Sequence, residues 1–258
     1  MITFRQAEGF SLLLILFFAS CQANNKAPYP TTIILSKEYS SKNCQKYFER
    51  IDSTLEFRFV NAYNLSSDSL EIELSLANGI ILTGGADINP ARYGADADTI
   101  KCGAIDNKRD SIEFRLLSHV KENSTPCLGF CRGLQIMNVF NGGSLHPHLP
   151  DTLSSIHRGL DGATTHSIQV IKHINSLNLE VGSTNDIISH HHQGINKLGA
   201  DLDVWAVAPD GLSEGIRHSD TTTYPFYVGV QWHPERCSPG NEFDNSIGKS
   251  FINAIIFK

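Results

Sequence analysis

A cysteine flanked by two glycines at the start of a helical pattern is the side chain best placed for chemistry. The apolar strand pattern of Cys127–Phe130 turns through Gly129-Phe130-Cys131-Arg132-Gly133 into an apolar helical run over 134–140. This G-x-C-x-G spacing is a cysteine version of the nucleophile elbow, a tight strand-to-helix turn that exposes one side chain above a sheet. The positive end of the helix dipole favours a thiolate there, although a buried structural cysteine is the alternative interpretation.

Two further segments carry groups that a cysteine nucleophile needs. Gly84 and Gly85 end an expected strand, and glycine lets a backbone N–H approach a substrate oxygen closely. Near the end of the chain a strand pattern leads to His233, and Glu235 follows across Pro234. A carboxylate in that place can orient the imidazole and stabilise its protonated form. Taken singly, the glycines could form an ordinary turn and the His-Glu pair a surface loop.

Alternating strand and helix patterns must position these groups. We expect strands at 31–35, 57–62, 79–83 and 127–130, and helices at 41–51, 67–77 and 106–121. This order predicts an α/β fold, a three-layer flavodoxin-like sandwich with a mostly parallel central sheet and ligands at the carboxyl ends of its strands. Shorter strand patterns at 167–171, 186–189, 203–208, 212–217 and 226–231 would extend the sheet or form antiparallel ribbons, before a closing helix at 241–257.

The first 26 residues are expected to be a lipoprotein-type signal peptide and tether, ahead of one domain over 27–258. The apolar run Phe10–Ser20 is too short to cross a bilayer. It ends in Phe18-Ala19-Ser20-Cys21, which resembles a lipobox, with Cys21 as the lipidated residue. The positive charge before the run is weak, and an ordinary secretory signal is the alternative. We therefore expect an exported, membrane-anchored bacterial lipoprotein on the periplasmic or cell-surface side.

Composition and cysteine spacing bear on which partners and metals the protein is expected to bind. Hydrophobic residues make up 41% of the 258, which suits a packed core, and the net charge of −6 argues against a nucleic-acid partner. Cys44, Cys102 and Cys237 lack metal-ligand spacing, although export would permit one disulfide. The adjacent histidines 190–192 alternate faces on a strand and do not form a chelating set. We expect no metal and no cofactor.

Several motifs in order resemble the class I glutamine amidotransferase superfamily, and within it the gamma-glutamyl-gamma-aminobutyrate hydrolase type. The resemblance covers most of 31–258. The motifs that carry it are Gly84-Gly85-Ala86-Asp87-Ile88-Asn89-Pro90 with Tyr93-Gly94, Cys131-Arg132-Gly133-Leu134-Gln135, Gly142-Gly143-Ser144-Leu145, Ser189-His190-His191-His192-Gln193, Ala208-Pro209-Asp210-Gly211, and Gly229-Val230-Gln231-Trp232-His233-Pro234-Glu235.

The resemblance implies hydrolysis of a gamma-glutamyl amide bond through a glutamyl thioester, releasing glutamate and an amine. The residues that it implies are a Cys131-His233-Glu235 triad, an oxyanion hole of backbone amides near Gly85 and Arg132, and a glutamyl pocket lined by Gln135, His191 and Gln193. The alternatives are a glutaminase subunit of an amidotransferase and a non-catalytic binding lipoprotein. The sequence leaves the amine and the oligomeric state open.

Two features depart from the family pattern or add to it. Ile188 stands where the family usually has an asparagine before the serine of the fourth motif. The charged run Asp106–Asp110 precedes a helix that borders the site in this family, and we expect its charges to form a solvated helix N-terminus.

The lipobox-like end predicts the cellular location of the protein. Cys21→Ser removes the thiol that would carry the lipid, so the variant should appear in the soluble fraction or remain unprocessed. Fractionation followed by mass spectrometry of the mature N-terminus measures both results. Wild-type protein found wholly in the cytosol with residues 1–20 retained would contradict the expectation.

Overall fold

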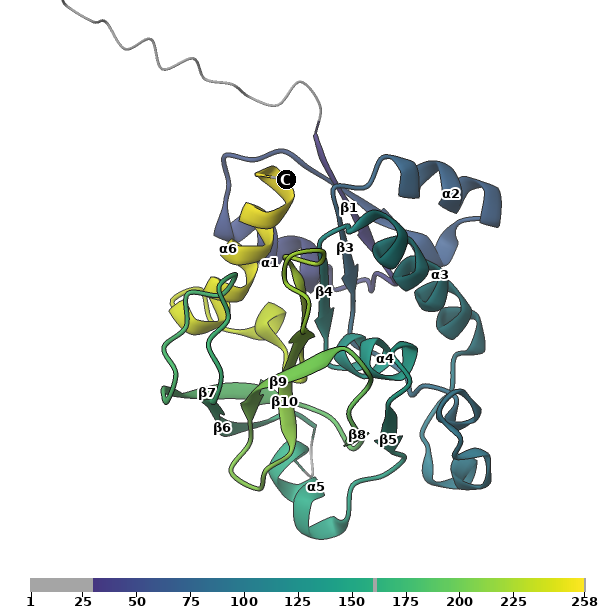
Figure 1. Cartoon of the computed structure of the whole chain (residues 1–258), viewed down its shortest axis with the longest axis vertical. Coiled ribbons are helices and arrows are strands. Elements are labelled where there is room, and N and C mark those ends of the chain that lie inside the picture. Colours follow the sequence, from purple (N-terminus) through teal and green to yellow (C-terminus); the bar gives the residue numbers. More distant parts are fainter. Residues whose placement is uncertain (1–29, 160–161, 258) are drawn as a thin grey trace, which may run out of the picture.

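The computed structural model describes residues 30–159 and 162–257 (Figure 1). The expected signal segment, with Cys21, lies outside the described residues, so the lipid anchor stays a prediction. Among the described residues, every helix is too short or too polar to cross a membrane. The five described cysteines are free thiols, including the three considered for a disulfide.

The described residues form a large sheet of nine strands whose first half is parallel. Five parallel neighbours lie in the order β2 (Phe57–Asn61), β1 (Thr31–Leu35), β3 (Gly79–Leu82), β4 (Cys127–Phe130) and β11 (Tyr227–Val230). Four antiparallel strands continue it as β10 (Ser213–His218), β9 (Leu202–Val207), β6 (Thr164–Val170) and β7 (Thr184–Ser189). The later strand patterns therefore extend the main sheet rather than forming separate ribbons.

Helices cover both faces of the parallel half, because its strands are apolar on both sides. On β1, Ile33 and Leu35 share a core with α1 (Asn43–Ile51) and α6 (Glu242–Ile256). The intervening Ile34 belongs to the opposite core, with α2 (Ser67–Ser75), α3 (Asn107–Asn123) and α4 (Arg132–Phe140). The period-2 alternation of a strand places neighbours on opposite faces. The three-layer sandwich is confirmed (Figure 1).

Three short elements are absent from the sequence-based expectation. Strands β5 (Ser144–His146) and β8 (Gly194–Lys197) pair as a separate antiparallel ribbon, and α5 (Asp151–His157) lies beneath the antiparallel half (Figure 1). Elements of three to seven residues span too few turns or alternations to show a periodic pattern.

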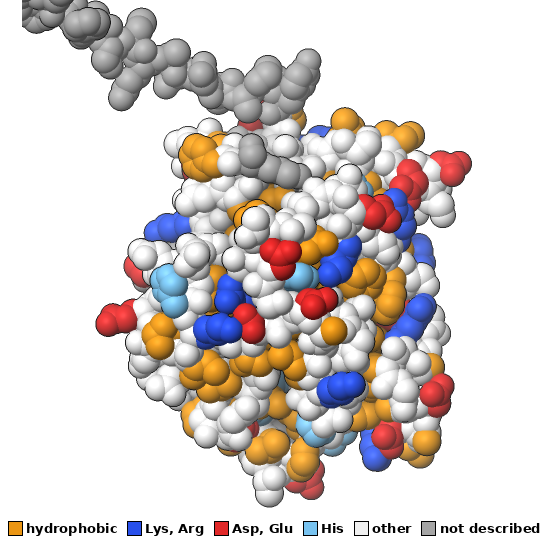
Figure 2. All heavy atoms as spheres, viewed as in Figure 1, with side chains coloured by type: hydrophobic (Ala, Val, Ile, Leu, Met, Phe, Trp, Pro, Cys, Tyr) orange, Lys and Arg blue, Asp and Glu red, His pale blue; other side chains and the backbone are white. Residues whose placement is uncertain are grey.

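The surface carries charges of both signs. On the face shown in Figure 2, acidic and basic side chains are interspersed and apolar side chains lie between them. This distribution agrees with the small negative net charge and gives this face no basic footprint for nucleic acid.

Candidate active site

Cys131 lies at the turn between β4 and α4, in a backbone conformation that non-glycine residues rarely adopt. Its φ is 50° and its ψ −103°. Such strain is concentrated at functional sites. The flanking glycines are required by contact: a Cβ on Gly129 would lie 2.6 Å from Met137 Sδ, and one on Gly133 would lie 2.0 Å from the Leu82 carbonyl oxygen. The elbow expected from the sequence is present.

His233 and Glu235 follow β11, the strand next to the elbow strand. The His233 backbone N–H donates to the Ile188 carbonyl at 3.0 Å, and Glu235 lies in the one-turn helix Pro234–Arg236. His233 Nδ1 lies 2.8 Å from Glu235 Oε1, and Cys131 is close enough to raise the pKa of the imidazole. The structure therefore brings the three expected triad residues together, with the imidazole between the thiol and the carboxylate.

Burial and charge act in opposite directions on His233. Burial lowers the pKa of its imidazole, but the Glu235 carboxylate and Cys131 raise it more strongly, to about 10. The pKa of Glu235 is held below its usual range: burial raises it, and the charge of His233 more than offsets that effect. The pair is therefore an ion pair at neutral pH.

The loop after β3 passes close to this pair. A Cβ on Gly84 would lie 2.9 Å from His233 Cε1 and 3.8 Å from Cys131 Cβ. Gly85 has a φ of +152°, and a Cβ there would lie 2.1 Å from Arg109 Nη1. Both positions therefore require glycine. A hollow of about 270 Å³ on the α1 side borders Gly84, Gly85 and Glu235.

The Arg109 side chain donates hydrogen bonds to two carbonyls of this loop. Its Nη1 donates to the Gly84 carbonyl at 2.9 Å, and its Nη2 donates to the Thr83 carbonyl at 2.5 Å. In a trans peptide the C=O and the next N–H point in opposite directions. The guanidinium therefore turns the Gly85 N–H away from itself.

The expectation of a solvated helix N-terminus at 106–110 is wrong for Arg109 and Asp110. Both side chains are fully buried, and with Glu113 and Arg132 they form a closed network of two cations and two carboxylates. Its ion pairs are Arg109–Glu113 at 2.8 Å, Arg132–Asp110 at 2.7 Å and Arg132–Glu113 at 2.9 Å. The sequence showed a charged helix start, and burial of that start depends on α4 packing beside it.

The expected substrate residues lie on one side of α4. Gln135 Nε2 donates to the Gln193 carbonyl at 3.0 Å, and His191 Nδ1 donates to the same carbonyl at 2.9 Å. All three side chains are buried. The His191 Nε2 faces Glu214 at 3.5 Å, so both ring nitrogens face protein groups. The substrate contacts assigned to the three residues stay predictions.

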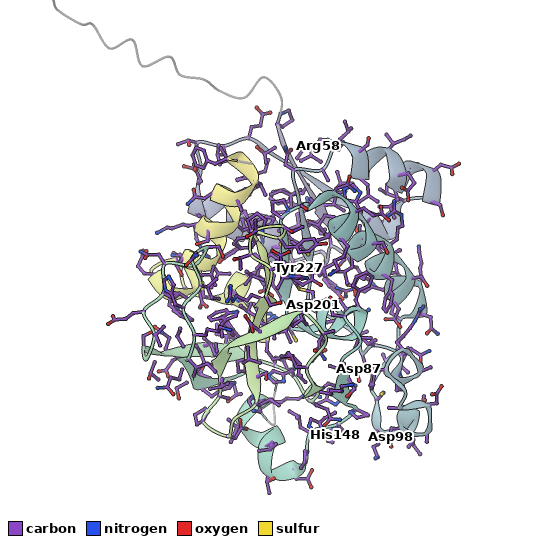
Figure 3. All side chains as sticks on the ribbon, in the orientation of Figure 1. Arg58, Asp87, Asp98, His148, Asp201 and Tyr227 are labelled. Carbon is purple, nitrogen blue, oxygen red and sulfur yellow. The ribbon has the colours of Figure 1, made fainter. Side chains whose placement is uncertain are left out.

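A polar chain joins the loops around Gln193. His192 bonds Asp87 at 3.1 Å and His148 at 2.9 Å, and Figure 3 labels Asp87 and His148 in the lower half of the molecule. The Gln193 amide nitrogen donates to the Pro147 carbonyl at 3.0 Å. Asp87 and His192 both lie in motifs found in the sequence. Their hydrogen bond was not predicted, because the two residues are 105 positions apart in the chain.

The buried network should be essential for stability. Glu113→Gln leaves two buried guanidinium groups without one carboxylate, so the free energy of unfolding should fall by about 3–5 kcal/mol. Urea denaturation measures the change. The matched control is Glu71→Gln, which breaks an exposed pair with Arg115 and should cost less than about 1 kcal/mol. An equal loss of unfolding free energy in Glu113→Gln and Glu71→Gln would contradict the inference that burial makes the network important for stability.

Comparisons with known proteins identify the family. The family model described as peptidase C26 matches residues 32–235. The Mycobacterium tuberculosis protein "Putative glutamine amidotransferase Rv2859c" is 37% identical over 173 residues, which cover 66% of this chain and 54% of the relative, so the match spans about half of that protein. The Escherichia coli K12 protein "Gamma-glutamyl-gamma-aminobutyrate hydrolase PuuD" is 31% identical over 195 residues, 72% of this chain and 74% of the relative.

The fold has solved counterparts. The crystal structure of a glutamine amidotransferase from Thermotoga maritima superposes with a TM-score of 0.60 at 11% sequence identity, covering 89% of this chain and all of that chain. At this identity the similarity shows the fold alone. Together with the family match over most of the chain, it leads to one conclusion: the chain belongs to the peptidase C26 family of class I glutamine amidotransferase-like proteins.

Proposed function

We propose that the protein hydrolyses gamma-glutamyl amide bonds, with Cys131 as nucleophile, His233 as general acid and base, and Glu235 as the group that orients His233. The observation that carries this proposal is the strained elbow cysteine next to an imidazole that a buried carboxylate holds. A nucleophile, a base and an orienting group in contact are the signature of covalent catalysis. The same arrangement argues against a non-catalytic binding protein.

The charge state of the pair supports the first step. With a pKa of about 10, His233 is an imidazolium at neutral pH and favours the Cys131 thiolate beside it. The thiolate is the form that attacks a carbonyl carbon. The Glu235 carboxylate stabilises the imidazolium without taking its proton.

We assign two backbone amides to the stabilisation of the oxyanion. Arg132 is the first residue of α4, and the first N–H groups of a helix have no intrahelical partner. Gly85 contributes the second N–H, because Arg109 fixes the preceding carbonyl on the opposite side of the peptide. The buried network holds the loop that carries Gly85 at two carbonyls: the Arg132 side chain bonds that of Ala86 at 2.9 Å, and Arg109 bonds that of Gly84. Rigid donors of this kind stabilise charge that develops in the transition state.

The reaction then proceeds in two steps. The Cys131 sulfur attacks the side-chain carbonyl of the glutamyl group, and His233 gives its proton to the departing amine as the C–N bond breaks. The product is a glutamyl thioester. His233 next takes a proton from water, the hydroxide adds to the thioester carbonyl, and breakage of the C–S bond releases glutamate.

The gamma-glutamyl class of substrate rests on the relatives. A hydrolase named for gamma-glutamyl-gamma-aminobutyrate is among them. Beside α4, the buried Gln193 Oε1 has no hydrogen-bond partner among the described residues and is suited to accept from the alpha-amino group of a glutamyl moiety. A site that pairs such groups rejects analogues that lack them.

Substrate selectivity tests the proposal. Purified protein should release glutamate from gamma-glutamyl-aminobutyrate and other gamma-linked amides far faster than from an alpha-linked glutamyl amide, measured by chromatography of both products. Cys131→Ala should remove this activity while the thermal unfolding curve is kept. The matched control Cys127→Ala changes a buried cysteine in β4, the strand that leads into the elbow, and it should retain turnover despite a stability loss of about 1–2 kcal/mol.

Cleavage of the alpha-linked amide at an equal rate would overturn the gamma-glutamyl assignment. Activity on glutamine alone would instead favour the glutaminase-subunit alternative. Full activity of Cys131→Ala would overturn the nucleophile.

The pH dependence tests Glu235. In the wild type, kcat/KM should fall as the pH rises through about 10, where His233 loses its proton. Glu235→Gln removes the negative charge that raises this pKa, so the falling limb should move to lower pH, and kcat should drop by about 10³–10⁴-fold. Glu242→Gln, at an exposed position in α6, is the matched control and should reproduce the wild-type profile. An unchanged profile in Glu235→Gln would remove Glu235 from the mechanism.

A further inference from the structure

A second cluster of polar side chains lies beneath the antiparallel half of the sheet. It consists of His157 at the end of α5, His166 on β6, His191 after β7 and Glu214 on β10. All four side chains are buried, with exposed fractions between 0% and 9%. One candidate ligand atom from each residue lies within 4.8 Å of the other three. The four residues come from four separate elements, and their donor atoms converge.

Each histidine is anchored by its far ring nitrogen. His157 Nε2 lies 2.9 Å from Asp210 Oδ2. His166 Nδ1 lies 3.0 Å from the Ser167 carbonyl, and His191 Nδ1 lies 2.9 Å from the Gln193 carbonyl. Carbonyl and carboxylate oxygens can only accept, so each far nitrogen carries the proton. Outer acceptors that fix the tautomer in this way are characteristic of metal-binding histidines.

When the three imidazoles are neutral, their near nitrogens therefore present lone pairs to one another. His157 Nδ1 lies 3.1 Å from His166 Nε2 and 3.3 Å from Glu214 Oε1. Glu214 Oε1 is also 3.5 Å from His191 Nε2 and 3.9 Å from His166 Nε2. Within the described part of the chain, His191 Nε2 and both Glu214 oxygens lack a hydrogen-bond partner. Four acceptors facing one another in a buried space are unfavourable unless a metal cation or a shared proton lies between them.

The spacing fits a tetrahedral ion of zinc size. Zinc–nitrogen and zinc–oxygen bonds of about 2.0–2.1 Å in a tetrahedron place neighbouring ligand atoms about 3.3–3.4 Å apart. Four of the six distances among these ligand atoms run from 3.1 to 3.9 Å and bracket that value, and the other two are within 4.8 Å. Three imidazoles and one carboxylate suit zinc better than magnesium or calcium, which take oxygen ligands.

We propose that His157, His166, His191 and Glu214 form a closed structural zinc site. The ion would join α5, β6, the segment after β7 and β10 across the back of the antiparallel sheet. Four protein ligands without an open position are typical of structural rather than catalytic zinc. The sequence-based expectation of no metal rested on the adjacent histidines 190–192. Of these three, only His191 belongs to the proposed zinc site.

The site supports the segment that leads to the candidate active site. The His157 carbonyl accepts from the His191 backbone N–H at 3.1 Å and from Ser189 Oγ at 2.8 Å. Ile188, which precedes Ser189, accepts a hydrogen bond from the His233 backbone N–H through its carbonyl. The Gln193 carbonyl accepts from the side chains of both His191 and Gln135. Zinc at His191 would therefore fix the strand end that positions His233 and the segment that carries Gln193.

Metal analysis of the purified full-length protein tests the site. Protein prepared without chelators should contain close to one zinc ion per chain by plasma mass spectrometry. His157→Gln and Glu214→Gln should each lose the zinc. The matched control is His190→Gln. His190 precedes the ligand His191 in the chain, but its own ring faces Arg236, so this variant should keep the zinc. Stripping zinc with a strong chelator should lower the Tm by at least about 5 °C, and added Zn²⁺ should restore it.

A measurement on wild-type protein covers the case in which the ligand variants fail to fold. X-ray absorption at the zinc edge should show three nitrogen ligands and one oxygen ligand at tetrahedral distances, with imidazole scattering. Wild-type protein that contains no zinc and whose Tm is unchanged by Zn²⁺ would overturn the proposal and leave a shared-proton network. Zinc retained in both ligand variants, or sulfur in the absorption spectrum, would place the metal elsewhere and overturn it equally. These readouts are independent of hydrolase activity.

Discussion

The buried network of Arg109, Asp110, Glu113 and Arg132 is the constraint on which the active-site geometry depends. Two cations and two carboxylates removed from water are expensive to bury, and they are tolerated because every charge faces an opposite one. Further N–H groups of the two arginines donate to the Thr83, Gly84 and Ala86 carbonyls. The network therefore ties α3, α4 and the loop after β3 into one rigid unit.

This unit explains why strain at the elbow can persist. The Cys131 backbone occupies an unfavourable conformation, and the surrounding structure must over-determine it. Gly133 packs closely against the Leu82 carbonyl on one side of the turn. On the other side, the Arg132 side chain forms ion pairs with Asp110 and Glu113. Any relaxation of the turn would separate buried charges. The cost of that separation keeps the thiol at the imidazole.

The antiparallel half of the sheet provides the other wall of the site. His233 leaves the last parallel strand and is held through its backbone by Ile188 of β7. A backbone carbonyl supplies this bond, so the departure from the family's usual asparagine at position 188 does not remove it. The cluster of His157, His166, His191 and Glu214 lies next to the same strand end. His233 is thus positioned by elements that share no sequence continuity with the elbow.

The sequence alone determined the parts of this protein that local pattern encodes. The strand-turn-helix with paired glycines, the βαβ alternation and the His-Pro-Glu segment depend on neighbours in the chain, and so they predicted the elbow, the parallel sheet and the proximity of His233 to Glu235. The burial of Arg109 and Asp110 depends on α4, more than twenty residues later, and a charged helix start looks the same whether solvated or covered. Only the tertiary structure decided that burial. It also decided the convergence of His157, His166, His191 and Glu214, because the distance between side chains on separate strands is set by packing and strand register, which no spacing along the chain records.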